Sequence, residues 1–262
     1  MAVNGAAGTL FAWSVLLRPV STDLDVPTDT LGTVFSLALV GFALAVLLGG
    51  RSVDRSGPRR GAAAAGLLSG VGLSVAATAP GPLLLHVGYG VLFGLGSGLA
   101  YLSAVTWASA RAVGHRPLAT SLVVASYAAG PILAAPVGAW AIDRWGWRPT
   151  LAAAGLGVAL VSLVASRALP GPSPAHRSER ASGPRPDGPG LAALWVLFLA
   201  AVAPGLLAFA YATEVARERG LSATAAAFVV SLMAAGNLAG RLLAAPLTHW
   251  VGVTAALWAD LA

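Results

Sequence analysis

Arg241 is the side chain with the clearest chemical potential, because it stands inside a long apolar run. Asn237 precedes it by four residues, a spacing that places both side chains on one face of a helix. A charged residue at the centre of a membrane helix costs about 2.5–3.5 kcal/mol to insert, so it generally faces a cavity or a partner. The planar guanidinium can hold a carboxylate through two parallel hydrogen bonds. The alternative interpretation is that Arg241 only extends its side chain to the membrane surface.

No residue pattern in the chain predicts catalysis or a bound cofactor. Gly94 and Gly96 lie inside an apolar run, without the strand that precedes a phosphate-binding loop. The histidines fall in different segments and lack the spacing of metal ligands. They are His86, His115, His176 and His249. We therefore expect neither an enzyme nor a metal or cofactor site.

A second cluster of charge lies within residues 50–60, between two apolar runs, and contains four arginines and one aspartate. Only 10% of the chain is charged, so this concentration is exceptional. Such a cluster is unstable in hydrocarbon and therefore marks where two membrane-crossing helices emerge into water. Its defining residues are Gly50, Asp54, Arg55, Gly57, Arg59 and Arg60.

The composition is that of an integral membrane protein. Hydrophobic residues make up 57% of the 262 residues, and the mean hydropathy is +0.78. A soluble domain has about 45–50% apolar and about 25% charged residues. The net charge of +6 comes from arginines that lie between apolar runs, so it reflects membrane topology and not a nucleic-acid partner. The expected surroundings are a lipid bilayer, in the cell membrane.

Eight apolar runs predict membrane-crossing helices, and residues 253–262 begin a ninth that stops after about half a crossing. We expect the first helix to end at Arg18-Pro19 and an acidic outer loop to follow over residues 21–30. The eighth is expected to end at Ala244, which places Arg241 about one turn before its end. The other expected ranges are 31–49, 61–78, 83–108, 118–142, 149–169 and 191–213.

The chain is expected to divide into two parts. Residues 170–190 are rich in proline, serine, glycine and arginine and read as a flexible linker. Residues 1–169 would form an N-terminal half of six helices, and residues 191–262 a truncated C-terminal half. If residues 50–60 lie inside, the inner segments hold ten arginines and the outer loops four, which favours this orientation. Residues 90–98 carry four glycines whose register predicts close helix packing.

The pattern Gly-x-x-x-Asp-Arg-x-Gly-x-Arg-Arg that begins at Gly50 closely resembles the loop between helices two and three of the major facilitator superfamily. The resemblance implies an all-α integral membrane protein with about eight and a half of twelve transmembrane helices present. It also implies that the charged cluster acts as a gating motif at the inner surface. The implied function is secondary transport, in which two halves rock about a central site.

A narrower resemblance follows from residues 94–101, 116–121 and 237–241, which are similar to oxalate/formate antiporters and monocarboxylate transporters. It implies that Arg241 holds a substrate carboxylate, with Asn237 beside it and Tyr101 inheriting a substrate contact by position. The sequence departs from those families at Ser121 and Ser126, which replace expected glycines. We expect a small organic anion, a mono- or dicarboxylate, as substrate, and a proton or a counter-anion as the coupled ion.

Several assignments have alternatives. Tyr101, Trp107, Phe11 and Trp13 can line a central cavity, with Trp13 as a substrate contact, or can pack between helices. Two glutamates near the outer end of the seventh helix, at positions 214 and 218, are expected to be solvated. The alternative functions are transport of another small solute, a non-transporting membrane sensor, and an inactive fragment.

Overall fold

The computed structural model describes residues 1–111, 116–171 and 188–251, and every element in these ranges is a helix. The elements are α1 (Ala2–Gly8), η1 (Thr9–Ala12), α2 (Ser14–Leu24), α3 (Thr28–Ala77), α4 (Pro82–Leu85), η2 (His86–Phe93), α5 (Gly94–Arg111), α6 (Arg116–Trp145), α7 (Trp147–Ser166), α8 (Gly188–Glu218) and α9 (Ala223–Val251). The apolar periodicity of the sequence therefore resolves into helices throughout the described ranges.

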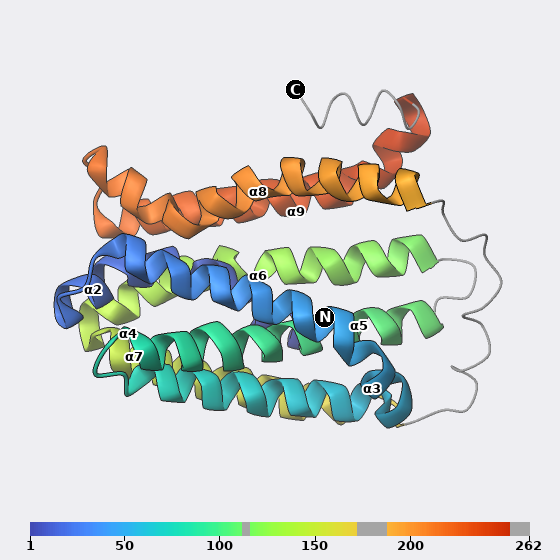
Figure 1. The fold of residues 1–262 in the computed structure, drawn as a ribbon, viewed down its shortest axis with the longest axis horizontal. Helices are drawn as coiled ribbons and strands as arrows, with labels where there is room; N and C mark the ends of the chain where they lie inside the picture. Colours follow the sequence, from blue (N-terminus) through green and yellow to red (C-terminus); the bar gives the residue numbers. More distant parts are fainter. Residues whose placement is uncertain (112–115, 172–187, 252–262) are drawn as a thin grey trace.

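Six of these helical stretches are long and apolar enough to cross a membrane. One of them, α3, contains 50 residues and reverses direction near its middle (Figure 1), so it supplies two crossings. The pieces α1, η1 and α2 follow one another from Ala2 to Leu24 and supply one more. Together the described residues form eight crossing segments, as the sequence predicts. The expected ninth segment, residues 253–262, lies outside the described residues.

The crossing segments form two groups. Helices α8 and α9 run side by side and are named here the α8–α9 pair (Figure 1). The elements from α1 to α7 pack against one another and are named the α1–α7 bundle. The linker expected at residues 170–190 lies largely outside the described residues, and α8 begins at Gly188. The two groups meet mainly where α6 packs against α9.

The reversal inside α3 falls on the charged cluster. Gly57 has φ +82° and ψ 157°, a backbone conformation that is essentially restricted to glycine, and the helix is interrupted there. Gly50 and Asp54 lie on the helical turns before this point. Arg59 and Arg60 follow it with exposed side chains. The prediction that residues 50–60 join two crossing helices is therefore confirmed.

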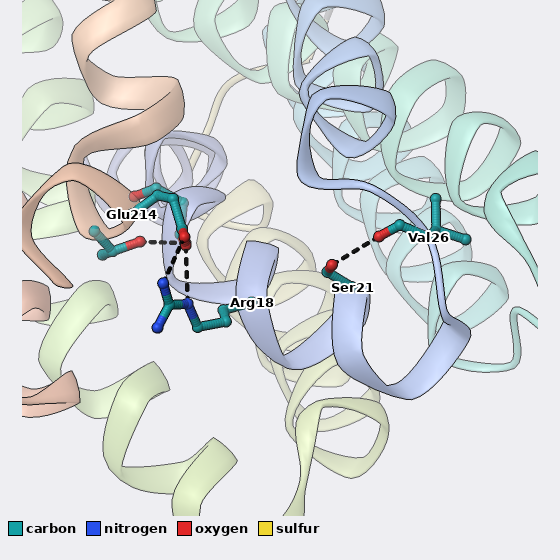
Figure 2. A network of polar contacts seen from close by, with 6 residues as sticks. Arg18, Ser21, Val26 and Glu214 are labelled. Atoms are coloured by element: carbon teal, nitrogen blue, oxygen red, sulfur yellow. Dashed lines mark hydrogen bonds and ion pairs between the residues drawn. The ribbon is translucent and has the colours of Figure 1, made fainter. Parts of the chain in front are cut away.

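The predicted end of the first helix is wrong. Pro19 lies inside α2, which continues to Leu24, and only three residues separate it from α3. Membrane helices tolerate an internal proline because neighbouring groups satisfy the freed backbone, so Arg18-Pro19 is no stop signal. The short turn is closed by the Ser21 hydroxyl, which donates to the Val26 carbonyl at 2.7 Å (Figure 2).

The glycines of residues 90–98 bring α5 and the π-helical segment η2 close to α3, which confirms the packing prediction. A Cβ on Gly94 would lie 2.5 Å from the Ala38 carbonyl oxygen, and one on Gly90 would lie 3.0 Å from the Leu37 side chain. The π-helical turns of η2 were not anticipated from the sequence. They lie where Gly88 meets the backbone of α3 at Ala76.

Candidate functional site

Arg241 lies near one end of the membrane-crossing part of α9. The stretch of α9 that is apolar enough to cross a membrane is Ala223–Leu243, so Arg241 lies two residues before its end. The helix itself continues to Val251. The expected position about one turn before the end of the crossing is therefore confirmed.

Asn237 holds the Arg241 side chain. The Arg241 Nε atom donates to Asn237 Oδ1 at 2.6 Å, one helical turn away. Within the described part of the chain, Asn237 is the hydrogen-bond partner of the Arg241 guanidinium. The Arg241 side chain is exposed. The bond uses the Nε atom, so the Nη1 and Nη2 atoms take no part in it. A carboxylate can accept two parallel hydrogen bonds from these two nitrogen atoms.

Tyr101 lies on α5, in the other group of helices. The charge of Arg241 acts electrostatically on the Tyr101 hydroxyl. The Tyr101 ring contacts Phe42 at 5.4 Å and Tyr127 at 5.8 Å between ring centroids. The two residues that the family resemblance links to a carboxylate ligand therefore lie within electrostatic range of each other, one in the α1–α7 bundle and one in the α8–α9 pair.

Tyr101 belongs to a larger group of rings, named here the central aromatic cluster. Its members are Phe11, Phe35, Phe42, Tyr101, Tyr127 and Phe209. Phe11 contacts several of the other rings, with centroid distances of 5.2 Å to Phe209 on α8 and 5.8 Å to Tyr127 on α6. The Tyr127 hydroxyl is hydrogen-bonded to Ser97 at 2.8 Å. Phe209 belongs to α8, so this cluster lies where the two groups of helices meet.

Sequence reasoning singled out Phe11 and Tyr101 but missed the rest of the cluster. Aromatic residues are common in apolar helices, so Tyr127 and Phe209 carry no distinguishing signal in the sequence. What assembles them is the crossing of α6 and α8 against η1, a tertiary relationship between distant segments.

Trp13 lies apart from this site. It is fully buried in the α1–α7 bundle, with its ring 4.4 Å from that of Tyr89. Trp107 packs beside a buried cluster that contains Ala104 and Val123. Both tryptophans take the packing role that was the alternative to lining a cavity. A substrate contact by Trp13 stays a prediction from sequence.

Polar contacts tie the α8–α9 pair to the α1–α7 bundle near the end where α2 stops. Arg18 forms an ion pair with Glu214, whose side chain is only 16% exposed (Figure 2). The Thr213 hydroxyl donates to the Ser14 carbonyl, and the Ser231 hydroxyl donates to the Ile132 carbonyl at 2.8 Å. The expectation of a solvated glutamate is thus wrong at position 214, because Arg18 approaches from the first crossing segment.

The remaining residues of the charged cluster lie at the opposite end of the molecule from these contacts (Figure 1). Arg55 is exposed and Asp54 is half-buried beside the turn. Val53, between them and Gly50, is packed with only 1% of its surface exposed. A Cβ on Gly61, just after the turn, would lie 3.2 Å from that valine, so both sides of the turn are tightly packed.

The chain belongs to the Major Facilitator Superfamily, whose family model matches residues 1–261. It is 27% identical over 252 residues to the uncharacterized MFS-type transporter YhjX of Escherichia coli K12, covering 91% of this chain and 61% of that protein. It is 28% identical over 254 residues to monocarboxylate transporter 11 of Homo sapiens, covering 92% of this chain and 53% of that protein. The chain thus spans between about half and three fifths of the length of these relatives.

The fold is similar to that of solved sugar transporters. A crystal structure of a D-xylose-proton symporter matches with a TM-score of 0.65 and 21% identity, over 94% of this chain and 67% of that one. A partially occluded inward-open structure of the xylose transporter XylE from Escherichia coli matches with a TM-score of 0.66 and 20% identity, over 95% and 72%. The protein is therefore a multi-pass membrane protein of a transporter family.

Proposed function

We propose that this protein is a secondary transporter of small organic anions, with a mono- or dicarboxylate as substrate. The observation that carries the proposal is the arrangement of Arg241, Asn237 and Tyr101. The hydrogen bond from Nε to Asn237 orients the guanidinium so that its Nη1 and Nη2 atoms remain for a ligand. A carboxylate accepts two parallel bonds from that edge, and a phenol such as Tyr101 can donate a third.

The location of the arginine supports the same conclusion. A carboxylate that enters the membrane must replace the hydrogen bonds it made to water. A fixed guanidinium does this through two directed donors, whereas the exposed aromatic and apolar surface nearby cannot. The similarity to monocarboxylate transporter 11, a relative named for this class of substrate, agrees with the proposal.

Movement of substrate requires the two groups of helices to rock against each other. In this proposal residues 1–169 form one half and residues 170–190 the linker. The half that starts at 191 contains α9 and all of α8 except its first three residues. The contacts at Arg18 and Thr213 would close one side of the central site, and the charged turn at Gly57, with Asp54, would control the other. Alternating access then exposes Arg241 to each side in turn.

The coupled ion in this proposal is a proton or a counter-anion. A carboxylate that crosses alone carries its charge through the membrane potential, which amounts to about 2.3 kcal/mol per 100 mV. For a monocarboxylate, one proton moved with it or one monoanion moved against it cancels that charge, and a dicarboxylate requires two protons or a dianion. With the charges balanced in this way, net transport is independent of the potential.

Uptake by proteoliposomes tests the substrate class. The protein, expressed from its native gene, is reconstituted and given radiolabelled monocarboxylates, dicarboxylates and a pentose. We expect saturable uptake of a carboxylate that is competed by unlabelled carboxylate but not by the corresponding amide, which has the same shape without the charge.

Two variants make the test specific for the site. Arg241→Ala should reduce carboxylate uptake to the level of empty liposomes. Arg219→Ala, which removes an exposed arginine after the end of α8, should leave uptake near the wild-type rate. Uptake of the pentose alone, or equal carboxylate uptake by both variants, would contradict the proposal.

A further inference from the structure

A cavity of about 450 Å³ lies inside the α1–α7 bundle. This volume is within the range of about 300–1,000 Å³ that is typical of ligand sites. Tyr89 and Phe93 of η2 form its inner wall and are only 2% and 1% exposed. Its other walls come from the first crossing segment, from α6 and α7, and from Leu73 of α3. Neither Arg241 nor Tyr101 lines it, so it is separate from the proposed substrate site.

The hydroxyl groups that line this cavity already donate their hydrogens to backbone carbonyls. The Thr9 hydroxyl donates to the Ala6 carbonyl at 2.8 Å, and the Tyr89 hydroxyl donates to the Leu10 carbonyl at 2.9 Å. The third lining hydroxyl, on Thr150, donates to a carbonyl of its own helix at 2.8 Å. Water needs two to four polar partners to be held in a buried site. The cavity therefore suits an apolar occupant.

The mouth of the cavity opens on the side of the bundle where α6 and α7 expose apolar side chains. Val137, Trp140 and Trp145 line the cavity and are also 59%, 51% and 57% exposed. In a membrane-crossing helix such surface faces lipid, so the route into the cavity leads from the bilayer.

The positively charged side chain of Arg144 lies at the mouth of this cavity. The two tryptophan rings are in edge-to-face contact at 5.2 Å, and the Arg144 guanidinium lies 5.5 Å from the centre of the Trp140 ring. Trp145 is the last residue of α6, so these three side chains lie at the helix end. Tryptophan and arginine at the end of a membrane helix lie at the level of the lipid headgroups.

We propose that this cavity binds one acyl chain of a membrane phospholipid whose phosphate pairs with Arg144. The lipid comes from the leaflet opposite the charged turn at Gly57, because α6 ends there. A phosphate accepts charge-assisted hydrogen bonds from a guanidinium, while the chain fills the apolar interior. An empty cavity of this size forfeits dispersion contacts along its walls, and an inserted chain restores them.

Gly138 provides a way to close the cavity without disturbing the fold. It lines the cavity, and a Cβ added to it would meet no atom within 4 Å. Gly138→Leu should therefore extend into the space that the acyl chain occupies. Gly157→Leu is the matched control, because Gly157 also has open space around its Cβ, is exposed on α7 and does not line the cavity.

The experiment uses a phospholipid that carries a photoreactive diazirine near the end of one acyl chain. The reconstituted protein is irradiated and the labelled residues are identified by peptide mass spectrometry. We expect labelling of Tyr89 and Phe93, which bulk lipid cannot reach. Gly138→Leu should lower this interior labelling at least about fivefold, while Gly157→Leu leaves it unchanged. Labelling of Leu156, which is 72% exposed on α7, serves as the internal reference in all three proteins.

A second variant tests the phosphate. Arg144→Gln should lower interior labelling by the phospholipid several-fold but should not change labelling by an uncharged alkyl diazirine of similar length. No interior labelling in the wild type, or equal interior labelling in Gly138→Leu, would overturn the proposal. If Arg144→Gln changed the labelling by both probes to the same extent, the proposal would also be overturned, because Arg144 would then make no specific contact with the phosphate.

Discussion

Arg18 and Glu214 form a two-point ion pair between the first crossing segment and α8, although 196 residues separate them in the chain (Figure 2). The distance from Arg18 Nη2 to Glu214 Oε1 is 2.7 Å, and that from Nε to Oε2 is 3.2 Å. The Thr213 hydroxyl adds a bond to the Ser14 carbonyl beside it. These contacts join the α8–α9 pair to the α1–α7 bundle at the end away from Gly57.

Removing this ion pair should loosen that end of the molecule. Arg18 is 42% exposed, so the pair contributes about 1 kcal/mol at most, which corresponds to roughly a fivefold change in an equilibrium. Ser14 is 1% exposed, and its replacement by cysteine is a probe of opening because the chain has no cysteine of its own. In a Ser14→Cys background, Glu214→Gln should raise the rate of labelling by a polar thiol reagent about two- to fivefold.

The control for this measurement is Glu218→Gln. Glu218 is one turn further along α8, is exposed, and acts on Arg18 only through space. It should change the labelling rate much less than Glu214→Gln does. Equal rates for the two variants would show that the ion pair does not hold this end closed.

The turn at Gly57 gives a stability prediction. Its φ of +82° and ψ of 157° form a conformation that costs about 1–3 kcal/mol for a residue with a side chain. Gly57→Ala should therefore lower the melting temperature of the detergent-solubilised protein by several degrees. Gly50→Ala is the matched control: that glycine is helical and has open space around its Cβ, so the melting temperature should not fall. A melting temperature for Gly57→Ala equal to that for Gly50→Ala would count against this account of the turn.

Topology can be tested with single cysteines. Thr28 begins α3 and Ser56 lies just before its reversal, so the two residues are at opposite membrane surfaces. The arginine distribution predicts that Ser56 faces the cytoplasm. Ser56→Cys should therefore be labelled by an impermeant maleimide only after the cells are opened, and Thr28→Cys in intact cells. Labelling of Ser56→Cys in intact cells would reverse the orientation.

The sequence predicted most of the fold because membrane helices are encoded locally. Apolar length and the charge at residues 50–60 located the crossing segments, and the four-residue spacing placed Asn237 beside Arg241. Helix ends were predicted less well. Pro19 predicts a helix end, but neighbouring helices can satisfy the backbone that a proline frees, and α2 continues past it.

Contacts between distant segments were beyond the sequence. Nothing near Glu214 indicates Arg18 as its partner, and nothing near Phe209 indicates Phe11. Such pairs depend on how α8 crosses the first segment, which no local pattern encodes. Only the family resemblance connects Tyr101 with Arg241.

The central claim is that Arg241 binds a carboxylate through a directed pair of donors, and Arg241→Lys tests it most directly. Lysine keeps the positive charge but has no planar fork and makes no equivalent bond to Asn237. Each charge-assisted hydrogen bond contributes about 1.5–3 kcal/mol, so the loss of one should weaken binding roughly tenfold or more. Arg241→Ala should abolish binding altogether.

The measurement is the concentration of carboxylate that half-protects a single cysteine near the site from alkylation. A suitable position is Leu238, which is half-buried and lies three residues before Arg241 on the same face of α9, replaced by cysteine in the wild-type, Arg241→Lys and Arg241→Ala backgrounds. We predict that Arg241→Lys raises this concentration about tenfold or more and that Arg241→Ala shows no protection. Equal half-protection in the wild type and Arg241→Lys would contradict the account, because a lysine that only reaches the membrane surface would serve as well as the arginine.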